Sequence, residues 1–309
     1  MSHIKKIATN QVTWLNIVNP TKDDIAFLRD EFHFHPINLE DASVNVRAQR
    51  PKFDMHDDYL FLVLHFPVYD EAAGRIKAAE VDFFIGKEHL ITVHDNSLTP
   101  VKDFEKLCLE FDHYREQYLS QNPSVLLYEI LDRLLEYCFP ILDHMSEDIE
   151  HIEDKIFAGE EKKIVKDILQ IKRNIANFRK IMQSHNKIIK KLIAMDTAFF
   201  PHVDMHQYYN DLVEETKDIW QILETHKETI DALHQTNDAS LSYKLNDIMK
   251  TLTIFSVVVF PLTLLAAIFG MNTEYLPVVG IPGDFWWITG FMLFLTLLMF
   301  FFFKRRNWL

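Results

Sequence analysis

The sequence predicts an α+β cytoplasmic domain followed by a long helical stalk and two C-terminal transmembrane helices. Three observations support this fold class. Two apolar segments, 251–269 and 285–303, contain no charged residue, and each is close to the ~20 residues that a helix needs to cross a bilayer. Short β-rich runs are confined to the first hundred residues, as expected for a domain that contains a sheet. The chain between that domain and the first apolar segment has the apolar spacing of helices.

The charge distribution separates the polar part of the chain from the membrane part. The 309 residues include 32 Lys and Arg against 45 Asp and Glu, a net charge of −13. Residues 251–309 hold three basic and two acidic side chains, so the first 250 residues hold the other 29 basic and 43 acidic ones. This excess of acid argues against nucleic acid as a partner, because binding to phosphates rests on Lys and Arg. It suits a surface that attracts cations, although negative charge also serves solubility alone.

No residue pattern indicates an enzyme. Cys108 and Cys138 are the only cysteines and form neither a CxxC pair nor a disulfide framework, so a reducing compartment is expected. The seven Gly form no Gly-rich phosphate loop and no GxSxG elbow. The first residues lack an apolar stretch, so we expect no cleaved signal peptide.

Residues 1–120 predict a cytoplasmic domain of mixed α and β structure. β-branched and aromatic residues dominate four short runs, two of which are separated by Gly86-Lys87-Glu88 and therefore predict a hairpin. The expected strands are 12–17, 59–66, 81–85 and 89–93. Thr21, followed by acidic residues, is typical of a helix start.

Residues 121–203 predict a cytoplasmic helical hairpin. Apolar side chains recur at helical spacing over 124–157 and again over about 161–195. Ala158-Gly159 separates the two runs, because glycine is a poor helix former. We therefore expect two long helices that pack against each other.

The third helical run, 204–270, meets no Pro or Gly before Pro261. A pattern so much longer than ~25 residues is typical of a stalk that continues into the membrane. The simplest interpretation is one uninterrupted helix whose last part, about 251–269, is the first transmembrane helix. Pro261 is expected to cause only a mild kink, because membrane helices tolerate proline.

Loop charge predicts the orientation of the spans. The loop between them, 270–284, has no Lys or Arg, whereas Lys244 and Lys250 precede the first span and the tail 304–309 is basic. By the positive-inside rule both termini are cytoplasmic and the loop is external. We therefore expect a multi-pass protein of the cell's inner (plasma) membrane.

One face of the first span is small or polar. Counting back from Gly270 in alternate steps of three and four residues follows one side of a slightly supercoiled helix. The residues on this stripe are Ala267, Thr263, Phe260, Ser256, Thr253, Met249 and Asn246. The simpler interpretation is a packing seam, because small residues let membrane helices approach closely.

A pore explains more of this stripe than a packing seam does. Thr, Ser and Asn can hydrogen-bond the water shell of a passing ion, and the lone bulky ring of Phe260 can gate by dewetting. No charge lies on the stripe, so a cation such as Mg²⁺, which gives up its water reluctantly, would pass with water attached. Since one helix cannot enclose a pore, several subunits must surround it.

Motifs over nearly the whole chain resemble the CorA family of divalent-cation channels. Gly270-Met271-Asn272 lies between the last two spans, where the family has the same tripeptide, and Phe260-Pro261-Leu262-Thr263 matches within the span. Near the N-terminus, His35-Pro36-Ile37-Asn38-Leu39-Glu40-Asp41 and Arg50-Pro51-Lys52 match as well. The tripeptide alone would be a weak signal, and the N-terminal matches make it specific.

The resemblance implies a funnel-shaped homopentamer in a lipid bilayer, with the first span of each subunit lining the pore. Asn272 would hold the hydrated ion at the outer mouth, and Asn246 matches a polar ring near the inner mouth. Asp41, with Glu40 beside it, matches a regulatory metal site between subunits, and Asp211 matches its partner across that interface. The implied function is uptake of Mg²⁺ gated by intracellular Mg²⁺, with Co²⁺, Ni²⁺ or Zn²⁺ as further ions.

Two departures from the family pattern concern the cation. Phe269 stands where members usually have Tyr, and the loop after Asn272 lacks the second acid common in well-studied magnesium channels. The element Gly280-Ile281-Pro282-Gly283 resembles the branch that includes the ZntB zinc transporters. A proton-coupled Zn²⁺ importer of the same fold is therefore an alternative function. A membrane-anchored scaffold without transport is a more distant one, and it predicts a uniformly apolar seam.

Overall fold

A six-stranded sheet with the strand order β1-β2-β6-β5-β4-β3 organises the N-terminal part of the chain. The strands are β1 (Ile4–Ala8), β2 (Thr13–Val18), β3 (Lys52–Met55), β4 (Leu60–Asp70), β5 (Arg75–Ile85) and β6 (His89–His94). Neighbouring strands are antiparallel except for β2 and β6, which are parallel. The expected hairpin is present as β5 and β6, closed by a hydrogen bond from Gly86 N to His89 O of 2.9 Å.

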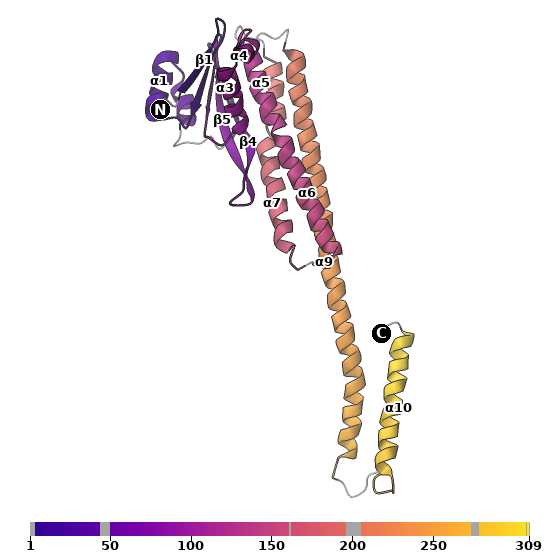
Figure 1. The fold of residues 1–309 in the computed structure, drawn as a ribbon. Helices are drawn as coiled ribbons and strands as arrows, with labels where there is room; N and C mark the ends of the chain where they lie inside the picture. The colour runs from indigo at the N-terminus through magenta and orange to yellow at the C-terminus, as the bar shows by residue number, and fades with distance from the viewer. Residues whose placement is uncertain are drawn as a thin grey trace. The chain divides into compact units, whose positions relative to one another are not determined.

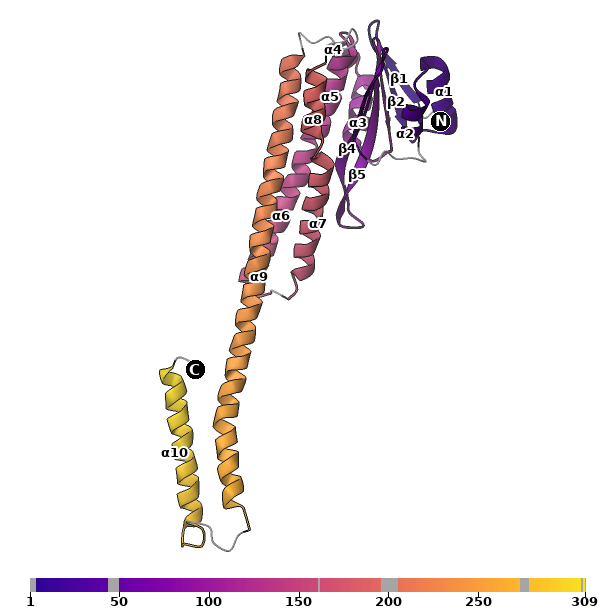
Figure 2. The ribbon, with the colours of Figure 1, turned by 180° about the vertical axis from the view of Figure 1, so that it is seen from behind.

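This structure is a computed structural model and describes residues 4–43, 50–160, 162–195, 205–272, 278–306 and 308. The expected boundary at 203–204 and the outer-loop residues 273–277 lie outside the described residues. The chain forms two units, Met1–His234 and Gln235–Leu309. The predicted fold class is confirmed as an N-terminal α+β part, a long helix and a C-terminal helix (Figures 1 and 2).

Both faces of the sheet are apolar and covered by helices. Successive side chains on a strand alternate between faces, so β4 contributes Leu60, Leu62 and Leu64 to one core and Phe61 and Val63 to the other. The second core is covered by α1 (Lys22–Phe32) and α2 (Pro36–Asp41), which lie on the opposite side of the sheet from α3 and α5 in Figure 2. Thr21 caps α1 through a capping box, as its sequence predicts.

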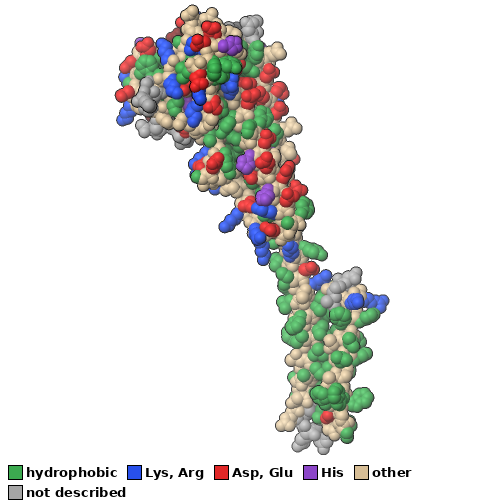
Figure 3. All heavy atoms as spheres, in the orientation of Figure 1, with side chains coloured by type: hydrophobic (Ala, Val, Ile, Leu, Met, Phe, Trp, Pro, Cys, Tyr) green, Lys and Arg blue, Asp and Glu red, His purple; other side chains and the backbone are tan. Residues whose placement is uncertain are grey.

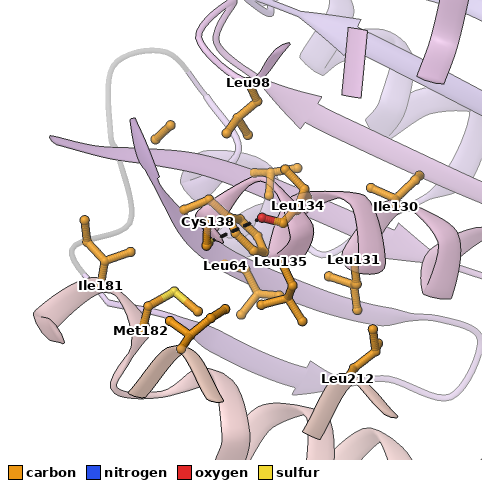
Figure 4. Close-up of a cluster of buried hydrophobic side chains, with 14 of the residues drawn as sticks. Leu64, Leu98, Ile130, Leu131, Leu134, Leu135, Cys138, Ile181, Met182 and Leu212 are labelled. Atoms are coloured by element: carbon orange, nitrogen blue, oxygen red, sulfur yellow. Dashed lines mark hydrogen bonds between the residues drawn. The ribbon is translucent and has the colours of Figure 1, made fainter. Parts of the chain in front are cut away.

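The first core is closed by the first part of α9 (His206–Phe269), which contributes Leu212 and Ile219, and by six further helices. They are α3 (Thr99–Glu110), α4 (Asp112–Leu119), α5 (Pro123–Glu136), α6 (Cys138–Phe157), α7 (Val165–Met182) and α8 (His185–Ile193). Each of the two helical runs predicted from periodicity is therefore divided, the first of them at Tyr137. Figure 4 shows Leu64 of β4 among leucines of α5, with Cys138 Sγ donating a hydrogen bond of 3.4 Å to Leu134 O. Burial raises the pKa of the Cys138 thiol, which makes this cysteine a packing residue.

A buried polar network fastens β2 and β6 to α3. Asn16 Nδ2 donates to Glu105 Oε2 at 2.6 Å, and Thr92 Oγ1 donates to Asn16 Oδ1 at 2.6 Å. Lys5 on β1 pairs with the other Glu105 oxygen at 2.5 Å. Buried polar groups are stable only when they are hydrogen-bonded, and here they bond one another.

The last two helices are α9 (His206–Phe269) and α10 (Asp284–Arg305). The expected continuous helix is present, because α9 runs unbroken for 64 residues with Pro261 inside it. Both helices are long and apolar enough to cross a membrane. Within the second unit, α10 runs beside the C-terminal part of α9 in the opposite direction (Figures 1 and 2).

The second unit leaves its apolar side chains exposed in a single chain. Phe260 is 71% exposed and Trp286 is 75% exposed, and hydrophobic side chains cover the visible surface of both helices, whereas acidic ones gather on the first unit (Figure 3). Soluble monomers do not expose apolar surface this extensively. A lipid bilayer is the environment that such helices require.

The buried His185 is expected to make stability depend on pH. It packs against Phe66 with ring centroids 5.0 Å apart, and burial lowers its pKa from 6.5 to about 4. Between these values the unfolded chain binds a proton on this imidazole and the folded chain does not, so stability falls as the pH falls from 6.5 towards 4. We expect His185→Leu to lose less thermal stability than wild type over this range. Unfolding midpoints of the detergent-solubilised protein would show this.

The exposed His113 supplies the matched control for that measurement, because His113→Leu should keep the wild-type profile. An equally steep loss of stability in His185→Leu and wild type would assign the pH dependence to other groups.

Candidate functional site

The seven stripe residues lie on one side of α9. At 3.6 residues per turn their positions fall within an arc of about 100°. None is charged, and six of the seven are exposed in the single chain, with Ser256 half-buried. The structure therefore leaves the face available to line a shared space between copies. The stripe residues are Asn246, Met249, Thr253, Ser256, Phe260, Thr263 and Ala267.

The hydroxyl groups on this face all donate to the backbone of their own helix. Thr253 Oγ1 donates to Met249 O at 2.7 Å. Ser256 and Thr263 make the same bond to the carbonyl four residues earlier, at 2.9 Å each. Each hydroxyl hydrogen is thus used, and the oxygen lone pairs remain as acceptors. Water around a cation directs its hydrogens outward, so a row of acceptors suits a hydrated cation better than a hydrated anion.

The turn after α9 continues the helical hydrogen bonding. Gly270 N donates to Ala266 O at 3.0 Å, and Met271 N donates to Ile268 O at 3.2 Å. A Cβ added at Gly270 would lie 3.1 Å from Ala266 O. The glycine therefore permits a close approach to the last helical turn, and its φ is not left-handed. Asn272 follows as an exposed side chain.

The Gly280–Gly283 element has a structural role at the start of α10. Gly280 and Gly283 have φ angles of +95° and +91°, which only glycine adopts readily. Asp284 then accepts hydrogen bonds from Gly280 N at 3.0 Å and from Phe285 N at 2.7 Å. These bonds satisfy amide donors at a helix start. The backbone thus explains the two glycines without reference to the transported ion.

Asp41 is paired with a cation from its own chain. It lies at the end of α2 and forms an ion pair with Lys52 Nζ on β3. The Asp41 side chain is 13% exposed, whereas its neighbour Glu40 is exposed. Hydrogen bonding to Asp41 raises the pKa of Lys52. A metal ion at Asp41 must therefore share the carboxylate with Lys52 or displace it.

A second carboxylate close to Asp41 was not predicted. Asp82 on β5 is 3% exposed, and its Oδ1 has no hydrogen-bond partner. Burial raises the pKa of Asp82, and the charges of Glu80 and Asp41 raise it further. The only sequence signal is an acid inside the otherwise apolar run 81–85, which the hairpin prediction did not weigh.

Asp211 belongs to a group of acidic side chains on α5 and α9. Burial raises the pKa of Glu215 to about 7, and charge repulsion from Asp132, Glu136 and Asp211 adds to the effect. Tyr128 donates a hydrogen bond of 3.3 Å from its hydroxyl to Asp132 Oδ1. In the sequence, the acidic group was visible only as Asp211 and Glu215, which lie one helical turn apart. The contribution of α5 required the tertiary structure.

A single chain does not assemble these carboxylates into a metal centre. Among the described residues, no three His, Cys, Asp or Glu side chains lie close enough to hold a metal ion. Asp41 and Asp211 belong instead to separate groups, one around Lys52 and one around Glu215. Any metal site that joins them needs a second subunit.

Comparison with known proteins identifies the family. The chain matches the CorA-like Mg²⁺ transporter protein family over residues 9–305. It belongs to the CorA-like family. Its members are transporters, and the expectation that the protein is not an enzyme is confirmed.

Individual relatives of the CorA-like family cover almost the whole chain. The cobalt/magnesium transport protein CorA of Thermotoga maritima is 28% identical over 305 residues, which is 96% of this chain and 83% of the relative. The CorA magnesium transporter of Methanocaldococcus jannaschii has a solved structure with a TM-score of 0.86 at 19% identity, covering 99% of this chain and 98% of that one. The ZntB cytoplasmic domain of Vibrio parahaemolyticus reaches a TM-score of 0.58 at 14% identity, covering 79% of this chain and 100% of the domain. The two structural comparisons show a shared fold.

Proposed function

We propose that this protein is a divalent-cation channel that takes up Mg²⁺, and also Co²⁺ and Ni²⁺, as a homopentamer in the inner (plasma) membrane. The observation that carries the proposal is the uncharged row of acceptor oxygens on α9, which ends at Gly270-Met271-Asn272. Family membership and a relative named a cobalt/magnesium transport protein support the choice of cargo. Both termini are cytoplasmic, as the basic residues flanking the spans indicate.

The pore is formed by the stripes of five α9 helices. A hydrated ion enters at the Asn272 ring, passes the hydroxyl acceptors and leaves by the Asn246 ring. Phe260 is the apolar constriction, and a narrow ring of such side chains can exclude water when the pore is closed. The membrane potential drives entry with about 2.3 kcal/mol per charge per 100 mV, hence roughly double for a divalent ion.

Feedback acts through the two acidic groups. At high cytosolic Mg²⁺ an ion bridges Asp41, with Glu40 beside it, and Asp211 of the neighbouring subunit, and holds the assembly closed. When Mg²⁺ falls the ion leaves, and repulsion between the carboxylates loosens the interface. Because α9 carries both Asp211 and the stripe, a shift of its cytoplasmic end reaches the pore along one helix.

Ion uptake into liposomes that contain the purified protein tests the cargo. We expect Mg²⁺ uptake to follow an inside-negative potential and to be independent of a pH gradient, with Co²⁺ and Ni²⁺ also entering. Uptake of Zn²⁺ that needs a pH gradient would instead establish the proton-coupled alternative. Absence of any cation flux from a correctly assembled oligomer would favour the scaffold interpretation.

Replacement of Asn272 tests the outer mouth. Its side-chain carbonyl accepts hydrogen bonds from the ion's water shell, so Asn272→Ala should abolish uptake while the oligomer stays assembled by size-exclusion chromatography. Val279→Ala, an exposed position in the same loop, should keep wild-type flux. Unchanged uptake in Asn272→Ala would exclude this turn as the selectivity element.

Charge reversal of both acids tests the feedback. The combined Asp41→Lys and Asp211→Lys variant should remain active at Mg²⁺ concentrations that close the wild type, because no ion can bridge the reversed positions. The double variant Glu71→Lys and Glu228→Lys makes the same charge change at exposed sites and should respond like wild type. Normal Mg²⁺ inhibition in the Asp41 and Asp211 variant would assign feedback to other residues.

Removal of the Lys52 charge should strengthen Mg²⁺ inhibition of the channel. Lys52 competes with a metal ion for Asp41, and an ion pair of this exposure is worth about 1 kcal/mol. Lys52→Met should therefore lower the Mg²⁺ concentration for half-inhibition about fivefold. Flux assays over a series of internal Mg²⁺ concentrations measure this shift, and a shift to higher Mg²⁺ would contradict the competition.

A further inference from the structure

A basic surface pocket lies between β5 and α7, apart from the acidic groups described above, and Lys77, Arg173 and Lys180 are exposed there. Its volume is about 360 Å³, and its lining includes Arg75, Lys77, Arg173 and Lys180. No carboxylate lines it among the described residues. We call it the β5–α7 pocket. A concentration of positive charge is unexpected in a chain whose net charge is −13.

Backbone periodicity explains why these four cations face one space. Arg75 and Lys77 are two residues apart on β5, so their side chains point to the same side of the strand. Arg173 and Lys180 are seven residues apart on α7, which is close to two helical turns and places them on one helix face. The pocket is therefore built from one strand face and one helix face.

Amide side chains of α7 hydrogen-bond the backbone at the start of β5, and so hold the two sides of the pocket together. Strand β6 pairs with β5 only over 81–85, so the first residues of β5 have a strand neighbour on one side only. On the other side, Ile76 N donates to Asn174 Oδ1 at 3.1 Å, and Asn177 Nδ2 donates to Ile76 O at 3.2 Å. Gln170 Nε2 donates to Gly74 O at 2.7 Å. These bonds make the pocket a fixed feature of the fold.

The pocket-facing cations of α7 differ from their neighbours on the same helix. Lys172 pairs with Asp231 at 2.6 Å, and Arg179 pairs with Glu224 at 2.7 Å, both on α9. One residue further along in each case, Arg173 and Lys180 have no carboxylate partner among the described residues.

The cations on β5 are partly compensated, because the carboxylate of Asp70 lies near both Lys77 and Arg75. Lys77 pairs with Asp70, whereas Arg75 Nε is buried without a hydrogen-bond partner. Like charges held together repel, and an anion between them removes that repulsion.

The chemistry of the lining selects the class of anion. Guanidinium groups bind phosphate oxygens in pairs, and lysine adds a point charge. The volume is in the range of small-molecule sites. We propose that the β5–α7 pocket binds an organic phosphate of nucleotide size, with its phosphates on Arg75, Arg173 and Lys180.

Binding of ATP to the full-length protein in neutral-lipid nanodiscs tests this site. In buffer without Mg²⁺, equilibrium dialysis should show ATP binding that pyrophosphate displaces and that salt weakens. Arg173→Glu and Lys180→Glu should each weaken binding about 10- to 100-fold, the range for loss of a charge-assisted hydrogen bond. Lys166→Glu makes the same charge change at an exposed position of α7 and should bind like wild type.

Two versions of this experiment, with neutral and with anionic nanodiscs, distinguish a free phosphate compound from a lipid headgroup as the natural ligand. Loss of ATP binding when wild-type protein is placed in anionic-phospholipid nanodiscs, but not in neutral ones, would identify a lipid headgroup as the competing occupant of the same phosphate site. Failure of both ATP and pyrophosphate to bind at millimolar concentration would overturn the proposal. So would an equal loss of binding in Lys166→Glu and Lys180→Glu. None of these outcomes depends on whether the protein transports Mg²⁺.

Discussion

The continuous helical backbone of α9 is the constraint on which the rest of the structure depends. A helix in hydrocarbon must satisfy its backbone groups internally, and α9 stays helical over 64 residues, although Pro261 has no N–H to donate to the carbonyl of Val257. The hydroxyls of Thr253, Ser256 and Thr263 bond to the same backbone, so the polar face adds no unsatisfied donor. The helix can therefore expose oxygen acceptors without a charge. In the proposed pore, several copies arrange that one face around the passing ion.

Charge lies mainly in the first 250 residues, whereas the proposed pore face is uncharged. Acidic residues are concentrated in the first 250 residues, and the spans hold none. A charge inside the bilayer is costly, whereas hydroxyl and amide oxygens are tolerated when their donors are satisfied. An uncharged pore also binds an ion weakly enough to release it, which conduction requires. In the proposed channel, the acids outside the membrane attract and sense the cation.

The sequence predicted what depends on local periodicity and missed what depends on tertiary packing. The length of α9, the β5–β6 hairpin and the Thr21 cap were all visible as patterns. The division between α5 and α6 was not, because Tyr137 keeps a helical φ of −62° and the apolar spacing continues across it. The Lys52 pair with Asp41 and the approach of Asp132 to Glu215 join distant segments. No spacing rule reveals such pairs in one sequence.

The two acidic groups are not equivalent partners for a metal ion. Asp41 is already neutralised by Lys52, so an ion gains attraction there only by weakening that pair. Around Asp211, burial and repulsion among carboxylates raise the pKa of Glu215 to about 7, so that group holds a proton part of the time at neutral pH. A divalent cation would replace the proton and remove the repulsion, since metal binding and proton release are coupled. In the proposed feedback, the Asp211 side therefore supplies most of the binding free energy. Lys52 limits what Asp41 adds and so keeps the affinity low, as a sensor of abundant Mg²⁺ requires.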